Sequence, residues 1–296
     1  MTTHAVPPPG FGRRLATWLH RHPRLQLGTL LAGPVGWLVI AYLGSLAILL
    51  LNAFWTTDSF SGRVVPTFTL ESFQTLLTVE VYRTIALRTL GMAVAVTLTD
   101  ILLAFPIAYY MARVASRGTR GFLVVAVLMP LWGSYLVKVY AWRVILQGNG
   151  LLDWALEPFG LSGPGLNQVA NSWVVLSYLW LPYMILPIYA GLERIPGSLL
   201  EASSDLGAKA GTTFRRVIVP LVLPAVVAGS IFTFSLTLGD YITPTMVSHT
   251  KFIGNVIYDN SSLGSLPLAA AFSFVPIIVM VAYLLIARRL GAFESL

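Results

Sequence analysis

Long apolar runs are the feature that most constrains how this chain of 296 residues can fold. An α-helix needs about 20 apolar residues to cross about 30 Å of hydrocarbon, whereas helices in soluble cores show runs of about 10 to 14. Only 10% of the residues are charged, too few to cover the surface of a soluble domain. We therefore expect an all-α membrane protein with six transmembrane helices at 29–52, 84–112, 121–140, 171–193, 222–247 and 266–287.

Basic residues cluster on one side of these expected spans. The clusters are Arg13, Arg14, Arg21 and Arg24; Arg113, Arg117 and Arg120; Arg194, Lys209, Arg215 and Arg216; and Arg288 and Arg289. By the positive-inside rule that side is cytoplasmic. It then holds the tails 1–28 and 291–296 and the loop 194–221, and residues 29–290 form the membrane domain. The formal charge of +7 reflects this topology and does not call for nucleic acid.

Three segments are expected on the opposite side of the membrane, at 53–83, 141–170 and 248–265. The second of them contains LLDWALEPF, which predicts a short helix between turns rich in glycine. The N-terminal segment is basic but lacks a small-residue cleavage site after a short apolar core. We therefore expect it to be a retained cytoplasmic tail, not a cleaved signal peptide.

Motifs for catalysis are missing from the sequence. The chain has no cysteine, no GxxxxGK[ST], no HExxH and no GxSxG. We therefore expect no catalytic residue, no metal and no cofactor in this chain, and any ATP-driven motor must be another polypeptide. His20 and His22 flank Arg21 and are interpreted as facing lipid headgroups, not as metal ligands.

The loop 194–221 predicts a helix–turn–helix. Leu199, Ala202 and Leu206 share one helical face, and Gly207 allows a turn because glycine accepts positive φ. Thr212 or Thr213 is expected to cap the second helix. The acidic pair Glu201 and Asp205 is spaced i,i+4, with Lys209 four residues further on. From the residues alone, an ordinary surface helix and a docking element are equally good interpretations.

A motif in this loop resembles one found in a known family. Glu201-Ala202-Ser203, Gly207 four residues later and Val217-Ile218-Val219-Pro220 after nine more resemble the EAA motif of ABC-importer membrane subunits. The chain departs from that motif at Ser203, Val217 and Val219. The resemblance implies coupling helices that dock in a groove of a cytoplasmic ATPase. It assigns this contact to Glu201, Ala202, Ser203, Asp205, Gly207 and Pro220.

The resemblance extends to the spermidine/putrescine subgroup of these permeases. It rests on AFPIAYYMAR, GNGLLD, LGDYITPTMV and LPYMILPIYAGLERIPGSLLEASSDLGA. It implies a type I ABC importer permease fold in a bacterial inner membrane and polyamine as substrate. It also implies a second, similar permease, two ATPase subunits that bind ATP-Mg, and an extracytoplasmic substrate-binding protein. Asp153, where the subgroup usually has asparagine, is a departure, and related subgroups carry ferric iron, opines, phosphonates or thiamine.

Two acidic residues lie inside expected spans. A charge near the bilayer centre costs about 2.5–3.5 kcal/mol, so Asp100 and Asp240 should each face a polar cavity or a partner. For Asp100 the alternative is a buried hydrogen bond to Thr97 or Thr99, or to a neighbouring helix. Asp240 lies beside Tyr241, and Pro244 is expected to break the helix there.

We interpret Asp240 and Tyr241 as lining a path for a cation, with Asp100, Trp180 and Tyr183 also on that path. Trp132, Tyr135 and Trp142 are further candidates, although aromatic residues near span ends are more often interface anchors.

Two alternatives to the importer interpretation come from other classes. An ion-coupled secondary transporter would use Asp100 and Asp240 as ion sites. It leaves the glycine-hinged loop unexplained, and we see no internal repeat of the kind common in such transporters. A membrane enzyme would need a nucleophile–base pair, which the sequence does not show.

Overall fold

The computed structural model describes residues 23–58, 62–161, 163, 165 and 168–289. His20, His22, most of the predicted N-terminal tail and the tail 291–296 lie outside the described residues.

The chain divides into two compact units, residues 1–52 and 53–296. In the first unit, α2 (Pro23–Trp37), the π-helical turn η1 (Leu38–Leu43) and α3 (Gly44–Leu51) follow one another. The apolar side chains of α3 are largely exposed, as expected for a helix that contacts lipid.

Three long helices form the centre of the second unit. They are α5 (Glu80–Tyr109), continued by the π-helical turn η3 (Tyr110–Val114), α9 (Val169–Glu193) and α12 (Val219–Gly239). These three pack against one another, and α15 (Leu266–Arg289) packs on α12. Small residues allow close contact, since a Cβ on Gly229 would lie 2.9 Å from the Met184 sulfur. Such small-residue contacts are typical of membrane helices.

The third predicted span is a broken helix. Residues 121–140 were expected to form one span, but α6 (Arg117–Trp132) and α7 (Tyr135–Leu146) meet at an angle of 94°. Gly133 and Ser134 have extended backbone between them, which ends α6. The Lys138 ammonium group then donates to the free carbonyl of Pro130 at 3.1 Å. Over the described residues, five helices are long and apolar enough to cross a membrane, and this bent pair makes a sixth.

The fifth predicted span, 222–247, is also interrupted. The helix α12 ends at Gly239, and the short helix α13 (Ile242–Val247) follows after Asp240 and Tyr241. Pro244 is the third residue of α13, and the break lies three to four residues before it. A proline removes the hydrogen bond to the carbonyl of residue i−4, here Asp240, so the expected break beside Pro244 is present. The Asp240 side chain stabilises the new helix start, because it binds the first amide groups of α13, as described below.

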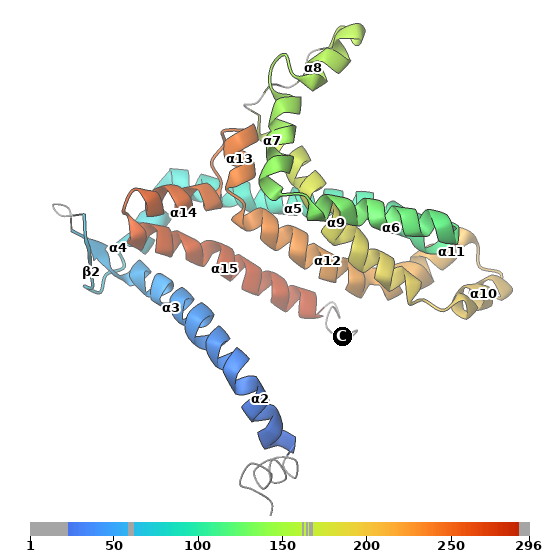
Figure 1. Cartoon of the computed structure of the whole chain (residues 1–296), viewed down its shortest axis with the longest axis horizontal. Helices are drawn as coiled ribbons and strands as arrows, with labels where there is room; N and C mark the ends of the chain where they lie inside the picture. The colour runs from blue at the N-terminus through green and yellow to red at the C-terminus, as the bar shows by residue number, and fades with distance from the viewer. Residues whose placement is uncertain (1–22, 59–61, 162, 164, 166–167, 290–296) are drawn as a thin grey trace, which may run out of the picture. The chain divides into compact units, whose positions relative to one another are not determined.

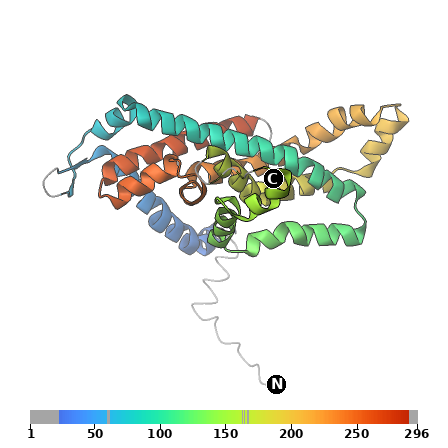
Figure 2. The ribbon, with the colours of Figure 1, turned by 90° about the horizontal axis from the view of Figure 1, so that it is seen from above.

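The segments between the spans contain short helices and one hairpin. A hairpin pairs β1 (Thr56–Thr57) with β2 (Val64–Val65), and α4 (Glu71–Thr78) follows. The predicted short helix is confirmed as α8 (Leu151–Leu156) with the 3-10 turn η4 (Glu157–Phe159). Residues 248–265 contain α14 (Ile253–Ser262). Within the second unit, α4 and α14 lie at one end and α10 (Gly197–Asp205) and α11 (Ala210–Thr213) at the other (Figures 1 and 2).

Candidate functional site

The two helix breaks meet in space. Tyr135 is the first residue of α7, and its hydroxyl donates to the Asp240 carboxylate at 2.5 Å. The Thr243 hydroxyl lies 2.8 Å from the Tyr135 hydroxyl and donates to the same carboxylate oxygen at 3.0 Å. The break after α6 and the break after α12 are therefore tied together by side chains that lie more than 100 positions apart in the sequence.

Asp240 also has a structural task. Its Oδ1 atom accepts hydrogen bonds from the backbone amides of Ile242 at 2.9 Å and Thr243 at 3.0 Å. These amides open α13 and would otherwise lack partners, as the first amides of a helix do. The side chain is only 9% exposed, and each carboxylate oxygen accepts two hydrogen bonds. The carboxylate is therefore held in one position.

A hollow of about 410 Å³ opens beside this network. It is lined by Tyr135, Trp180, Ser235, Leu236, Gly239, Asp240, Tyr241 and Ile242. The rings of Tyr135 and Trp180 are nearly parallel, with centroids 6.0 Å apart, and Tyr241 stacks on Tyr258 at 4.7 Å. The hollow also lies at the C-terminal end of α12, where a helix carries partial negative charge. These lining residues include one acid and no Lys or Arg, so the hollow suits a cation.

Three of the five predicted path residues line this hollow, and two do not. Asp240, Tyr241 and Trp180 line it, and Tyr183 lies behind Trp180 with ring centroids 6.0 Å apart. Tyr135, which the sequence marked only as a minor candidate, is central to the hollow. The sequence feature that could have identified Tyr135 is its position directly after Gly133 and Ser134, where α6 ends.

Asp100 lies elsewhere, in the contact between α5 and α9. It is 0% exposed, and neither carboxylate oxygen has a hydrogen-bond partner among the described residues. The alternative of a bond to Thr97 or Thr99 is wrong, because Thr97 donates to the Ala93 carbonyl and Thr99 accepts from the Trp173 indole. The Ser177 hydroxyl of α9 faces the carboxyl group but does not reach hydrogen-bond geometry.

The predicted helix–turn–helix is present at the other end of the unit. The helix α10 ends at Asp205, Gly207 turns the chain with φ +74°, and α11 begins at Ala210. The π-helical turn η5 (Phe214–Ile218) continues α11 into α12. We call residues 197–218 the elbow. Its two arms are joined by the hydroxyls of Ser203 and Thr213, which lie 2.8 Å apart.

Two details of the elbow differ from expectation. Lys209 precedes α11 and does not continue the face of Glu201 and Asp205, because the chain reverses at Gly207. Thr212 and Thr213 are not caps. Their backbone amides donate to the Lys209 carbonyl at 2.8 and 3.1 Å, which places both residues inside α11.

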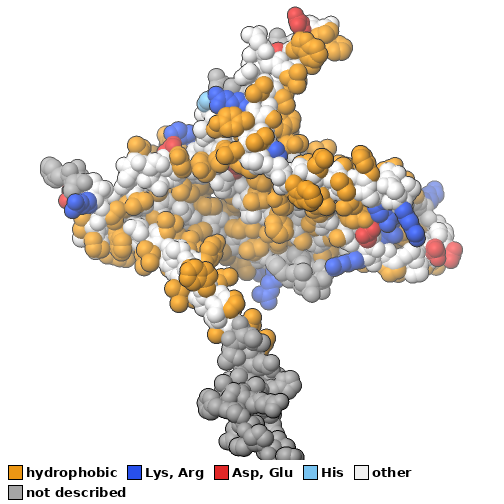
Figure 3. Space-filling view, viewed as in Figure 1, with side chains coloured by type: hydrophobic (Ala, Val, Ile, Leu, Met, Phe, Trp, Pro, Cys, Tyr) orange, Lys and Arg blue, Asp and Glu red, His pale blue; other side chains and the backbone are white. Residues whose placement is uncertain are grey.

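The elbow is exposed at its tip and anchored at its base. Glu201, Ala202, Asp205, Gly207 and Pro220 are exposed, Ser203 is half-buried, and the Leu206 side chain is 88% exposed. At the base, the Phe214 ring packs edge-on against Phe105 of α5 with centroids 5.4 Å apart. Lys and Arg side chains gather at this end of the unit, whereas hydrophobic side chains cover the face of the bundle in view (Figure 3). Motion of the elbow would therefore reach α5 and α12 directly.

The bundle of candidate spans is that of a helical membrane protein. A family model described as "Binding-protein-dependent transport system inner membrane component" matches residues 93–293. The chain belongs to this family. It is therefore a multi-pass inner-membrane permease component of a binding-protein-dependent ABC importer.

Named relatives and solved structures agree with this family. The inner membrane ABC transporter permease protein YdcU of Escherichia coli (strain K12) is 46% identical over 97% of this chain and 96% of its own length. The spermidine/putrescine transport system permease protein PotB of the same strain is 31% identical over 86% of this chain and 94% of its own length.

Among solved structures, a chain of a bacterial alginate ABC transporter, in complex with an alginate pentasaccharide-bound periplasmic protein, matches with TM-score 0.72 and 19% identity. The match covers 93% of this chain and 96% of that one. A chain of the MetNI methionine ABC transporter in an inward-facing conformation matches with TM-score 0.55 and 15% identity, over 75% of this chain and 99% of that one. These matches confirm the predicted type I ABC importer permease fold.

Proposed function

We propose that this permease component carries polyamines, and that the hollow beside Asp240 is part of the path. The observation that carries the proposal is the lining of the hollow, which combines one carboxylate, aromatic faces and a helix C-terminus. Each of these features attracts a cation, and ammonium groups bind aromatic faces within about 6 Å of the ring centroid. The relation to PotB, whose name states spermidine and putrescine, supports the same substrate class.

Asp240 acts in this proposal through its charge more than through direct contact. Its oxygens already accept four hydrogen bonds, so an ammonium group would rest on the rings of Trp180 and Tyr135. The carboxylate attracts the cation across a few ångströms of low-dielectric surroundings. Neither Tyr183 nor Asp100 lines the hollow in the described arrangement. In this proposal they become part of the path only when the helices move apart.

The elbow is proposed to transmit force from outside the chain. Glu201, Ala202, Asp205 and Gly207 form the exposed tip that docks on one of two cytoplasmic ATPase subunits, and the half-buried Ser203 joins the two arms behind it. Pro220 starts the span that is moved. Those subunits bind ATP-Mg and hydrolyse ATP, so this chain is itself non-catalytic and has no cofactor. A second permease and an extracytoplasmic binding protein complete the assembly. Both termini are cytoplasmic, and transport proceeds by alternating access.

One observation favours a second candidate, an ion-coupled transporter. Asp100 is fully buried without a hydrogen-bond partner among the described residues, as an intramembrane ion site can be. The two mechanisms separate in proteoliposomes. ATP-driven uptake stops with vanadate and continues when an ionophore collapses the ion gradients, whereas ion-coupled uptake shows the reverse.

The substrate proposal is tested with the assembled transporter in proteoliposomes. We expect ATP-dependent uptake of labelled putrescine or spermidine that excess thiamine, phosphonate or ferric iron does not compete away. Trp180→Leu should abolish most of this uptake because it removes the ring that faces the hollow. Trp173→Leu is the matched control, since Trp173 lies on the same helix outside the hollow. Equal losses in both variants, with equal amounts of assembled transporter, would contradict the role of the hollow.

A further inference from the structure

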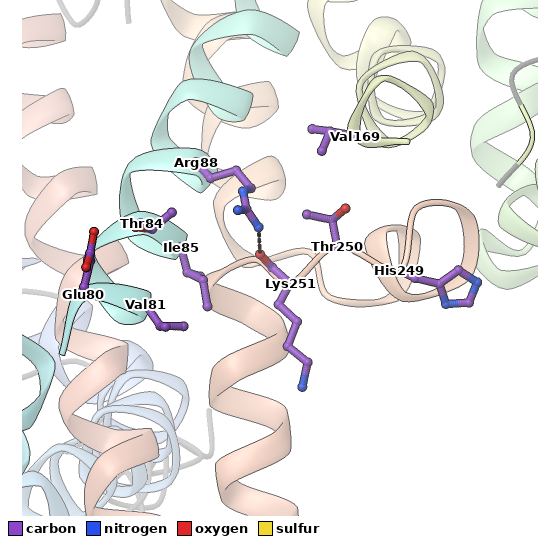
Figure 4. Close-up of a pocket in the computed structure, with 9 residues that line it drawn as sticks. All are labelled: Glu80, Val81, Thr84, Ile85, Arg88, Val169, His249, Thr250 and Lys251. Carbon is purple, nitrogen blue, oxygen red and sulfur yellow. Dashed lines mark hydrogen bonds between the residues drawn. The ribbon is translucent and has the colours of Figure 1, made fainter. Parts of the chain in front are cut away.

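A second hollow of about 660 Å³ lies beside the first turns of α5 (Figure 4). It is bounded by the first turns of α5 and by the segment that precedes α14. Its lining residues are Glu80, Val81, Thr84, Ile85, Arg88, Val169, His249, Thr250 and Lys251. The elbow packs at the far end of α5, whose 30 residues measure about 45 Å. The hollow and the elbow therefore lie near opposite ends of α5.

Arg88 is the charge in this hollow that has no acidic partner. Its guanidinium donates one long hydrogen bond, 3.4 Å, to the Lys251 carbonyl (Figure 4), and it forms no ion pair with any described residue. Lys251 pairs instead with Asp259 at 2.5 Å. Glu80 lies two helical turns before Arg88, at the margin of the hollow. A guanidinium inside a membrane span should face water or a partner, and here it faces the open hollow.

The wall that carries His249 is held in a defined shape. His249 has φ +52°, a conformation that L-residues adopt at a cost and that is retained where the surroundings fix it. Ser248 just before it bonds the Ser172 hydroxyl of α9 at 2.8 Å, and the Ile253 amide just after it donates to Thr89 of α5 at 3.0 Å. The segment is thus anchored to two spans, α9 and α5.

We propose that Arg88 receives a carboxylate side chain of the extracytoplasmic substrate-binding protein. The inference rests on the proposed function, because it takes the partner and the outward orientation of this end from there. This hollow lacks the aromatic lining of the proposed substrate path, and Arg88, whose charge has no ion-pair partner among the described residues, faces it. A guanidinium binds a carboxylate with two parallel hydrogen bonds, and the hydroxyls of Thr84 and Thr250 in the same hollow can donate more. Docking there would press on α5, the helix that also touches the elbow.

The test measures docking itself. The assembled transporter is placed in nanodiscs, and its Kd for the labelled binding protein is measured at two salt concentrations. Arg88→Gln should raise the Kd about tenfold or more, and Arg88→Glu further, because a charge-assisted bond is lost or reversed. Arg88→Lys should keep part of the affinity. Arg83→Gln is the matched control, since Arg83 is exposed on the same helix but does not line the hollow.

Three outcomes would overturn the proposal. The first is a Kd for Arg88→Gln equal to that of the parent. The second is loss of the other permease subunit from the Arg88→Gln complex, which would assign the hollow to subunit assembly. The third is loss of a bound anionic lipid, seen by native mass spectrometry, with docking unchanged. Failure of the polyamine proposal would look different, because docking affinity does not depend on which solute enters the path.

Discussion

Replacing Asp240 by asparagine separates its charge from its hydrogen bonds. The asparagine oxygen can still accept from the amides of Ile242 and Thr243, so α13 keeps its cap. The negative charge disappears, together with the charge-assisted bond from Tyr135. The variant therefore tests attraction of a cation without removing the helix start. Asp240→Ala, by contrast, also removes the cap and should unfold at a lower temperature.

The size of the effect follows from the geometry of the hollow. The Tyr135 hydroxyl touches the carboxylate, and the Trp180 centroid is 6.0 Å from that of Tyr135. A cation over these rings lies about 7 Å from the charge, where Coulomb attraction at an effective dielectric constant of 20 is about 2 kcal/mol. Since 1.4 kcal/mol corresponds to a factor of ten, occupancy of the hollow should fall about 30-fold. We expect polyamine uptake to fall by about an order of magnitude or more.

The assay is initial uptake of labelled spermidine at saturating binding protein, normalised to the amount of assembled transporter. Glu71→Gln provides the control, because it removes an exposed acid of α4 far from the hollow. Basal ATP hydrolysis should be unchanged in both variants. Spermidine uptake by Asp240→Asn within a factor of two of the parent would refute the electrostatic argument.

Three further predictions concern the elbow and the bundle. Glu201→Lys should reduce both ATPase association and uptake, measured by co-purification and transport, while Glu201→Gln retains more of each. Gly207→Val should cost about 1–2 kcal/mol because φ is +74° there, and should lower transport per ATP hydrolysed. Gly229→Leu should destabilise the bundle by about 1–3 kcal/mol in thermal unfolding, because its Cβ would meet Met184. Gly91→Ala, which meets nothing within 4 Å, should leave stability unchanged.

The long helices and the elbow could be predicted from sequence because their causes are local. Apolar length determines α9 and α15, and the conformational freedom of glycine at Gly207 determines the turn. The interruption of the fifth span was expected beside Pro244, whereas that of the third span was not predicted. The bond between Tyr135 and Asp240 that accompanies them joins residues 105 positions apart, and hydropathy averages across both breaks.

The site was predicted in part for the same reason. Asp240 and Trp180 carry chemistry that is recognisable in one dimension, and both line the hollow. Tyr135 resembled an interface anchor until the fold placed it against Asp240. Asp100 was grouped with Asp240 by residue type, yet the packing of α5 on α9 buries it away from the hollow. Which helix faces which neighbour is a property of the whole bundle.

The bond between Tyr135 and Asp240 has a consequence for how the permease changes shape. Because this hydrogen bond joins the two interrupted spans at their interruptions, a large displacement of one span relative to the other must break it. Rearrangement at this point should then involve two states, one with the Tyr135–Asp240 bond formed and one with it broken. In the proposed function, a cation bound beside Asp240 would weaken the hydrogen bond between Tyr135 and the carboxylate. Substrate binding would then favour the rearrangement.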